Sequence, residues 1–386
     1  MKRSKMRGWA GALIALTLVG AACSEDTVAP TDGGGGEGSI WVLLPDTASS
    51  DRWEKDDRRF FTEAFEAAGL VDGEDFSIVN AEGDAAAQQA QAEQAINDGA
   101  SVILLTSLDT GSGGAIIDQA KEANVQVVEY DRFNTGSSGG AAYVSFDNVR
   151  VGATMAEVVT PVIDALPADP KRVVMLNGGE EDNNAFLFRD GYNATVEEKV
   201  SAGEWELVAD QFVPGWDNAE AQTIMEQILV DANNDVDAVF AANDGLANSV
   251  ANAVEAAGFG PIPISGQDAT AEGMQNVLLG RVTMSVYKPI EAEAAVAAAV
   301  ALALRAGDDI TAVTSDFDFT IIGINSSDGK PSDSTEGDGV VPYFALVPIG
   351  VTEENMESTV IADGFRTVEE ICVGDVAETD WCTSMV

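Results

Sequence analysis

The sequence contains no histidine, the side chain that most often serves enzymes as a general base or a metal ligand. A Ser-His-Asp triad cannot be assembled, so the G-x-S-x-G match at residues 136–140 does not indicate a hydrolase. The chain has no Walker-type phosphate loop, and the acidic stretch 231–242 lacks the glycine and glutamate of a calcium loop. No pair of carboxylates stands out as an acid and a base. These absences predict a protein that is not an enzyme and uses no cofactor or metal.

Basic residues are scarce, since the chain has 20 Lys and Arg against 65 Asp and Glu and a formal net charge of −45. Nucleic acids and anionic membrane surfaces would both repel so acidic a chain. The charge balance therefore argues against both as partners. The length of 386 residues and the hydrophobic content of 46% are sufficient for two or three domains with buried cores.

A long apolar run is also missing, because residues 9–19 are too few to span a bilayer. Basic residues precede this run and small residues follow it, which predicts a signal peptide over residues 1–22. Cys23 follows at once and resembles the lipid-modified cysteine of bacterial lipoproteins, although Gly20 stands where a leucine-like residue is usual. The Gly-rich stretch 23–38 is predicted to be a flexible tether. We expect an extracytoplasmic protein that reaches the membrane only through a lipid anchor on Cys23.

The chain has only three cysteines, and two of them, Cys372 and Cys382, lie near the C-terminus. In an exported chain this spacing favours a disulfide that closes a short loop. A metal site is the weaker alternative, because the sequence offers neither histidine nor a second cysteine pair.

From residue 39 onward, apolar runs typical of buried strands alternate with segments of helical periodicity. Strands are predicted at 40–44, 76–79, 102–105, 125–130, 142–146, 172–176, 206–212, 238–242, 263–265, 282–287 and 341–347. Helices are predicted at 51–68, 85–97, 114–123, 151–166, 185–200, 219–231, 246–257, 270–279 and 291–305. The polar stretch 325–339 is predicted to be a surface loop. Because the strand–helix alternation runs twice, we expect an α/β fold with two doubly wound parallel-sheet lobes.

Polar and aromatic side chains follow most of the predicted strands. They are Arg52 and Trp53, Asp131 and Arg132, Asp182 and Asn184, Trp216, Asn243, Gln267 and Asp268, and Lys288. Each one alone is also an ordinary helix cap, turn residue or solvated charge. The carboxyl ends of parallel strands lie at one edge of a sheet, so two facing lobes would bring these side chains to one site.

The corner after the strand at 172–176 is the most informative of these. Asp182, Asn183 and Asn184 supply a carboxylate and two amides, with Phe186 and Phe188 close behind. This mixture suits a polyhydroxy ring, which has hydroxyls around its edge and C–H groups on its faces. An Asx turn followed by a helix N-cap explains the same residues equally well.

These segments resemble, in the same order, the type I sugar-binding proteins of bacterial ABC importers, and among them the xylose-binding group. The resemblance runs from about residue 40 to 365 and is carried by residues 51–56, 130–132, 145–148, 182–185, 215–216, 243–244, 266–269 and 286–289. It implies two lobes joined by three crossings, near 147–148, near 288–289 and within 307–319. One lobe would comprise 39–147 and about 289–318, the other 148–288 and about 319–365, with 366–386 as a tail.

By matching position, the resemblance assigns the sugar contacts to charged and amide side chains, with Trp216 and Trp53 stacking on the ring. The others are Arg52, Asp131, Arg132, Asp182, Asn184, Asn243, Asp268 and Lys288. The implied ligand is a monosaccharide, first D-xylose, passed to a membrane permease with its ATPase. Phe186 also matches a sister group that accepts several aldoses and signals to chemoreceptors, so a broader aldose-binding or sensory protein is the alternative.

Overall fold

The computed structural model describes residues 38–385 and has the α/β fold that the sequence predicts. The predicted signal peptide (1–22), Cys23 and the tether as far as residue 37 lie outside the described residues. Within the described part, none of the helices combines the length and the apolar character needed to cross a bilayer.

The larger lobe is built on an eight-stranded sheet. In spatial order its strands are β11 (Pro331–Ser332), β10 (Phe319–Asn325), β12 (Val340–Leu346), β5 (Ala142–Phe146), β4 (Gln126–Tyr130), β3 (Ala100–Leu105), β1 (Ser39–Leu44) and β2 (Phe76–Asn80). The strands from β12 to β2 pair in parallel, whereas β10 pairs antiparallel with both β12 and β11.

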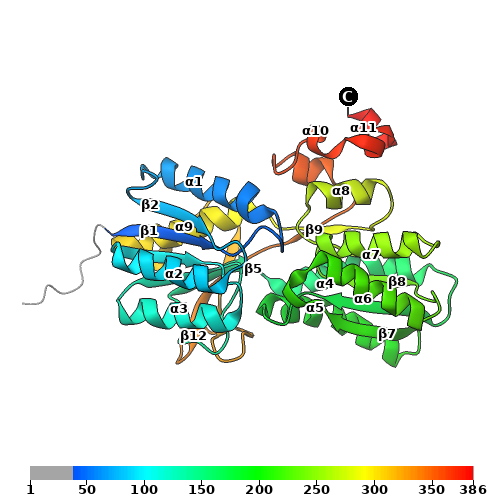
Figure 1. Cartoon of the computed structure of the whole chain (residues 1–386), viewed down its shortest axis with the longest axis horizontal. Coiled ribbons are helices and arrows are strands. Elements are labelled where there is room, and N and C mark those ends of the chain that lie inside the picture. Colours follow the sequence, from blue (N-terminus) through cyan, green and yellow to red (C-terminus); the bar gives the residue numbers. More distant parts are fainter. Residues whose placement is uncertain (1–37, 386) are drawn as a thin grey trace, which may run out of the picture. The chain divides into compact units, whose positions relative to one another are not determined.

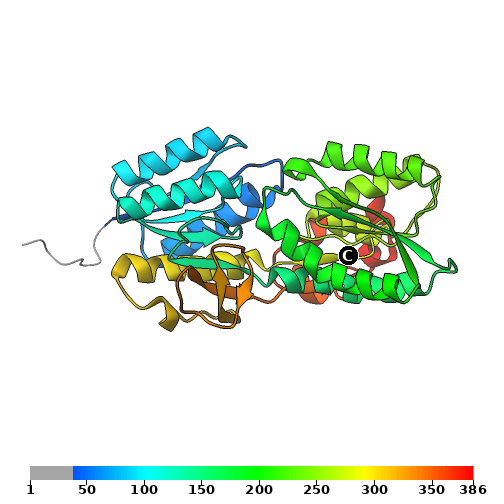
Figure 2. The same cartoon turned by 90° about the horizontal axis from the view of Figure 1, so that it is seen from below.

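Helices cover both faces of this sheet (Figures 1 and 2). One face packs against α1 (Arg58–Ala67) and α9 (Ile290–Ala306), the other against α2 (Ala85–Asn97) and α3 (Thr110–Glu122). Strand β1 alternates between the two layers, since Val42 belongs to one apolar cluster and Trp41 and Leu43 belong to the other. Burial on both faces explains why β1 is a continuous apolar run without polar alternation.

The smaller lobe has a three-stranded parallel sheet of β7 (Trp205–Phe212), β6 (Lys171–Asn177) and β8 (Ala238–Ala241). Isolated bridges at Ile264 and Gln267 link it to the pair β9 (Ser285–Tyr287) and β13 (Ile349–Val351), so the predicted strand 263–265 is only a bridge. The helices of this lobe are α4 (Asn148–Asp164), α5 (Asn183–Ser201), α6 (Asn218–Asp231), α7 (Asp244–Ala256) and α8 (Ala271–Leu278).

The structure corrects one part of the predicted lobe assignment. Residues 319–346 were assigned to the smaller lobe, but β10 and β12 extend the sheet of the larger lobe beyond β5. The third crossing therefore lies at residues 347–348, between β12 and β13, and not within 307–319. Strand β10 was not predicted, and β11 interrupts the predicted loop 325–339. Pairing with β5, nearly two hundred residues earlier in the chain, is what fixes this segment, and no local sequence pattern encodes it.

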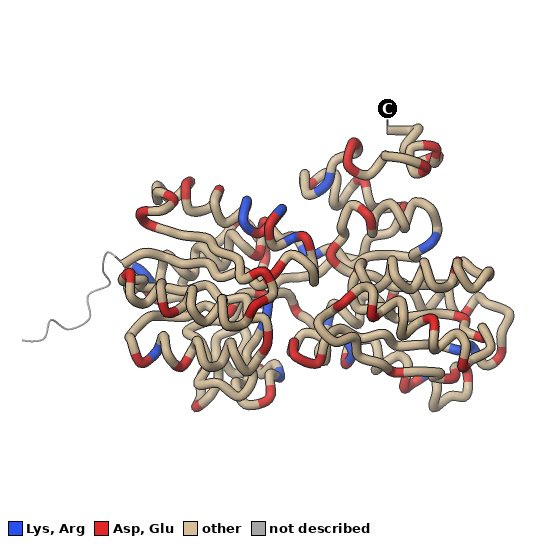
Figure 3. Tube along the Cα trace, in the orientation of Figure 1, with Lys and Arg blue, Asp and Glu red and all other residues tan. Residues whose placement is uncertain are grey.

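Short helical turns and the C-terminal segment complete the described chain. They are η1 (Trp53–Asp57, a π-helix), η2 (Pro214–Trp216), η3 (Ile310–Ala312), η4 (Glu357–Ile361), α10 (Val368–Ile371), η5 (Gly374–Glu378) and α11 (Asp380–Ser384). Cys372 and Cys382 form the disulfide predicted from their spacing. Figure 3 shows Asp and Glu spread over the trace of both lobes, with Lys and Arg few.

Helices α4 and α5 cross at two glycines. A Cβ atom built on Gly152 would lie 1.9 Å from the Phe188 carbonyl oxygen, and one on Gly191 would lie 2.2 Å from the Val149 carbonyl oxygen. Both obstacles are backbone atoms, which cannot rotate away. The close approach of the two helices therefore requires the absence of side chains at both positions.

We predict that Gly152→Ala lowers the free energy of unfolding by about 1–3 kcal/mol, because the added methyl group forces α4 away from α5. Urea denaturation followed by circular dichroism measures the change. The control is Gly111→Ala, at an exposed position in α3 where the nearest atom to the new Cβ is a side-chain oxygen 3.2 Å away. Equal stability of Gly152→Ala and the wild type would contradict this account of the helix crossing.

Candidate functional site

A cavity lies where the carboxyl ends of the strands of the two lobes meet. Its walls hold all ten predicted ligand contacts: Arg52, Trp53, Asp131, Arg132, Asp182, Asn184, Trp216, Asn243, Asp268 and Lys288. Ser49, Ser50, Phe188 and Gln267 complete the lining. The cavity contains about 320 Å³ of space free of protein atoms, part of it open to solvent.

Arg52 is buried at the start of η1 and is held by three carboxylates. Its Nε and Nη2 donate to Asp57 at 2.9 and 2.7 Å, Nη2 also donates to Glu293 at 2.8 Å, and Nη1 donates to Asp131 at 2.8 Å. A guanidinium has five N–H groups, so one on Nη1 remains for a ligand. The carboxylates thus fix Arg52 in place and leave it one donor.

Asp131 follows β4 and lies at the centre of the polar contacts. One oxygen, Oδ2, accepts from Arg52 and from Lys288 Nζ at 3.3 Å, and Oδ1 accepts from Asn184 Nδ2 at 3.3 Å. Burial alone would raise the pKa of this carboxyl, but the charges of Lys288, Arg52 and Arg132 outweigh burial and lower it. Asp131 is therefore an ionised acceptor throughout the neutral pH range.

Arg132 and Asp182 form a second charged pair across the cavity, with Nε 3.2 Å from Oδ2. Arg132 also donates to the Ser107 carbonyl oxygen at 3.0 Å. The other Asp182 oxygen caps α5 by accepting from the Asn184 backbone N–H at 2.9 Å. Burial raises the pKa of Asp182, and Arg132 offsets part of that rise. Asp182 is thus both the N-cap of α5 and part of the cavity wall.

The side-chain amide of Asn184 forms hydrogen bonds with other groups of the protein. Its Nδ2 donates to the Asp131 carbonyl oxygen at 2.8 Å, and its Oδ1 accepts from Asn148 Nδ2 at 2.9 Å and from the Tyr143 hydroxyl at 3.3 Å. In this arrangement Asn184 lines the cavity and orients Asp131.

The opposite wall contains polar atoms that have no hydrogen-bond partner among the described residues. They are Trp216 Nε1, Gln267 Oε1 and Asp268 Oδ1, all buried. Lys288 Nζ lies 3.4 Å from Asp268 Oδ1, a charge contact without hydrogen-bond geometry. Asn243 caps α7 through its Oδ1, which accepts from the Leu246 N–H at 2.9 Å. Burying a polar atom without a partner is unfavourable, so one donor and two acceptors gathered in one cavity indicate a polar ligand.

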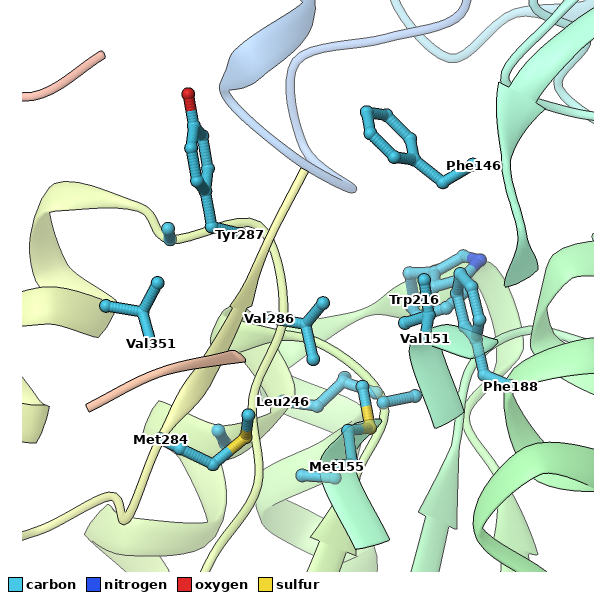
Figure 4. Packing of buried hydrophobic residues seen from close by; sticks show 14 of the residues in the cluster. Phe146, Val151, Met155, Phe188, Trp216, Leu246, Met284, Val286, Tyr287 and Val351 are labelled. Carbon is cyan, nitrogen blue, oxygen red and sulfur yellow. The ribbon is translucent and has the colours of Figure 1, made fainter. Parts of the chain in front are cut away.

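An aromatic wall faces these polar groups. Trp216 is buried, and its ring fills the space beside Gly178, where a Cβ would lie 2.1 Å from the indole. Phe188 packs edge-on against Trp216 at a centroid distance of 6.4 Å. Figure 4 shows the two rings in the same apolar layer as Val151. The Arg52 guanidinium lies over the Trp53 ring, and its Cζ is 4.2 Å from the centroid of that ring. The site therefore combines flat apolar surfaces with hydrogen-bonding groups.

The charges on the cavity wall balance. The cations Arg52, Arg132 and Lys288 stand against the anions Asp131, Asp182 and Asp268. A site for an anion or a cation would carry an excess of the opposite charge, so this one suits a neutral polar molecule. Among residues 38–385, no group of three or more acidic, cysteine or histidine side chains is arranged to hold a metal ion.

Sequence reasoning missed two wall residues and misplaced one candidate. Ser49 and Ser50 lie in the loop between β1 and η1, and only their closeness to Arg52 in sequence could have indicated them. Gln267 was noted at a strand end, and Phe188 was noted in the corner after the strand at 172–176. Neither was predicted as a ligand contact, and both line the cavity. Phe186 does not line it, because it is 40% exposed and packs against Phe212 at 5.0 Å.

Comparison with known proteins agrees with this architecture. A sequence profile described as a periplasmic binding protein domain matches residues 41–309. The D-xylose-binding periplasmic protein of Escherichia coli (strain K12) is 33% identical over 324 residues, covering 83% of this chain and 89% of that protein. The multiple sugar-binding periplasmic protein SbpA of Azospirillum brasilense is 28% identical, covering 85% of this chain and 90% of that protein.

Solved structures share the fold. The carbohydrate transporter solute-binding protein from Chloroflexus aurantiacus, in complex with D-glucose, superimposes with a TM-score of 0.73 at 23% identity, covering 86% of this chain and 97% of that one. The sequence profile spans more than half of this chain. The Escherichia coli protein is one third identical to this chain, and the match covers most of both. The chain therefore belongs to the periplasmic binding protein family.

Proposed function

We propose that this protein is the extracytoplasmic substrate-binding lipoprotein of a sugar ABC importer and that it binds a monosaccharide, first D-xylose, in the cavity described above. The observation that carries the proposal is the gathering of ten polar and aromatic residues, from positions 52 to 288, around one charge-balanced cavity. Three buried polar atoms of the cavity wall have no hydrogen-bond partner within residues 38–385, and sugar hydroxyls would supply partners for them.

Each class of side chain has a role in this proposal. Asp131, Asp182 and Asp268 accept hydrogen bonds from hydroxyls, and Lys288 and the free N–H of Arg52 donate to hydroxyl or ring oxygens. Trp216 covers a C–H face of the ring and excludes water, while its Nε1 donates to a hydroxyl at the edge. Both lobes contribute to the wall, so the sugar favours the closed arrangement only as far as its contacts there exceed those in the open one. The bound form is then handed to a permease, whose ATPase supplies the energy.

D-xylose is the first choice because the Escherichia coli relative named for D-xylose is 33% identical to this chain over most of both lengths, whereas the relative named for multiple sugars is 28% identical. The alternative is a broader aldose-binding protein that also or instead signals to a chemoreceptor or sensor kinase. The relative named for multiple sugars favours that alternative. A pentose and a hexose differ here by one hydroxymethyl group, which the shape of the cavity admits or rejects.

In a thermal-shift panel of D-xylose, L-arabinose, D-ribose, D-glucose and D-galactose, we predict the largest rise in Tm with D-xylose. A ligand that binds only the folded state stabilises it by about 2.7 kcal/mol at a hundred times Kd. Similar rises with D-xylose and the hexoses would favour the broader aldose-binding protein. No rise with any monosaccharide would contradict the proposed function.

We predict that Asp268→Ala and Trp216→Ala each weaken D-xylose binding about tenfold or more. The first removes a buried acceptor and leaves Lys288 with one anion fewer, and such losses cost roughly 1–3 kcal/mol. The second removes the apolar surface on which the ring would stack. Isothermal titration calorimetry at neutral pH measures Kd.

Matched controls for these variants lie outside the cavity. Asp235→Ala removes an exposed carboxylate that pairs with Arg172 in the same lobe, and Trp381→Ala removes an indole from the C-terminal segment. Both controls should bind as the wild type does. Unchanged Kd in Asp268→Ala and Trp216→Ala, with both folded by circular dichroism, would remove these residues from the ligand site.

The lipid anchor is proposed from the sequence around Cys23. We predict that Cys23→Ser moves the mature protein from the membrane fraction to the soluble extracytoplasmic fraction, because a serine cannot carry the thioether-linked lipid. Fractionation followed by immunoblotting measures the shift. The control is Cys372→Ser, which breaks the Cys372–Cys382 disulfide and leaves Cys23 in place. A wild-type protein that is wholly soluble would contradict lipidation and leave the sugar site unaffected.

A further inference from the structure

The loop that carries Asp268 has an unusual backbone. Asp268 has φ +95° and Ala269 has φ +45°, so two consecutive residues other than glycine adopt left-handed conformations. Such conformations are unfavourable for residues with a Cβ and persist only where the surroundings impose them. Something next to this loop must therefore hold it in place.

The Asp244 side chain, at the start of α7, lies directly behind the loop. Its Oδ2 accepts from the Thr270 backbone N–H at 2.8 Å and from the Thr270 hydroxyl at 3.0 Å. Its Oδ1 accepts from the Ser285 hydroxyl at 2.6 Å, and that hydroxyl oxygen accepts from the Ala269 N–H at 3.0 Å. The backbone N–H of Asp244 donates to the Gln267 carbonyl oxygen at 2.8 Å. One residue thus holds the loop, directly or through Ser285, at 267, 269 and 270.

The neighbouring sequence is shaped around this carboxylate. A Cβ on Gly266 would lie 2.4 Å from Asp244 Oδ1, and a Cβ on Gly273 would lie 2.0 Å from Oδ2. Neither glycine has a positive φ, so space rather than backbone conformation excludes a side chain there. Asp244 is 1% exposed and does not line the cavity, whereas Asn243 before it does.

We infer that Asp244 is a positioning residue for ligand binding, which holds the left-handed turn at Asp268 and Ala269 and so directs the Asp268 carboxylate at the sugar. The inference rests on the proposed function and adds a residue that touches no ligand itself. Without these hydrogen bonds the turn would relax toward ordinary φ values and carry Asp268 away from the cavity.

Because Asp244 ionises, its role can be tested through the pH dependence of sugar affinity, which a merely structural role would not affect. Burial raises its pKa to about 7, with the Asp268 charge adding to the rise and the hydrogen bonds from Ser285 and Thr270 opposing it. The charged group acting on it is Asp268 in the loop, while the N-cap of α8 and strand β9 contribute the uncharged hydroxyls of Thr270 and Ser285. Lys288, which follows β9, contacts Asp268.

The ionised carboxylate accepts the hydrogen bonds from the Thr270 N–H, the Thr270 hydroxyl and the Ser285 hydroxyl, and protonation gives up an acceptor site. Sugar affinity should therefore fall as the pH is lowered through 7. The free energy of unfolding changes in the opposite direction. The pKa of Asp244 is higher in the folded state than in the unfolded chain, so its contribution to stability is largest at low pH. That contribution is lost as the pH rises from about 4 to about 7.

The test compares Asp244→Asn and Asp244→Ala with the wild type, using D-xylose as the probe in calorimetry at pH 6, 7 and 8. Asp244→Asn keeps one acceptor oxygen and cannot ionise, so its Kd should be close to that of the wild type at pH 6 and show no pH dependence. Asp244→Ala should weaken binding about tenfold or more at every pH. Hydrogen exchange at the amides of Ala269 and Thr270 should be faster in Asp244→Ala.

The control is Glu129→Gln in β4, another buried carboxyl whose pKa is raised to about 7 by burial and which does not line the cavity. It should leave Kd and its pH dependence unchanged. A folded Asp244→Ala that binds as the wild type does overturns the inference. If Asp244→Ala does not fold, a pH dependence of Kd in Asp244→Asn equal to that of the wild type overturns it. If the wild type binds no sugar, the proposed function is overturned, and the proposed role of Asp244 in sugar binding is overturned with it.

Discussion

The Asp131 carboxylate connects the charged groups on which the cavity depends. It accepts from Arg52, which follows β1, and from Lys288, which follows β9, while Asn184 of α5 donates to both its side chain and its backbone. Buried charges are tolerated only when they are paired and hydrogen-bonded, so each of these groups depends on the others. This mutual dependence joins segments from both lobes around one point. It also places cations and anions in balance, which is the property that suits the site to an uncharged sugar.

The backbone around this point is strained in three places, each at a wall residue. Asp131, Trp216 and Asp268 have φ values of +60°, +54° and +95°, although none of them is glycine. Left-handed conformations of this kind gather at functional sites, where the surrounding structure imposes them. At Asp268 the imposing groups are Asp244 and Ser285. Rigid wall residues lose little conformational freedom when a ligand binds, and this favours affinity.

Much of the fold could be predicted because local patterns carry it. Strands such as β1 and β6 are apolar runs buried on both faces, and helices such as α2 and α5 begin at Asp residues that cap their first turn. The prediction failed where long-range pairing decides the outcome. Residues 319–325 contain a threonine, a glycine and an asparagine among their apolar residues, and only pairing with β12 makes them a strand of the larger lobe. The lobe boundary and the third crossing were wrong for the same reason.

The sequence alone determined which residue types stand at the strand ends. Since parallel strands present their carboxyl ends at one edge, it also determined that Arg52, Asp131, Asp182, Asn243 and Asp268 would lie near one another. The tertiary structure alone decided how these groups divide their hydrogen bonds. The Asn184 amide and most N–H groups of Arg52 form hydrogen bonds within the protein. In contrast, Trp216 Nε1, Gln267 Oε1 and Asp268 Oδ1 have no hydrogen-bond partner among the described residues. Hydrogen bonds depend on distances of a few tenths of an ångström between groups far apart in the chain, and residue order does not specify those distances.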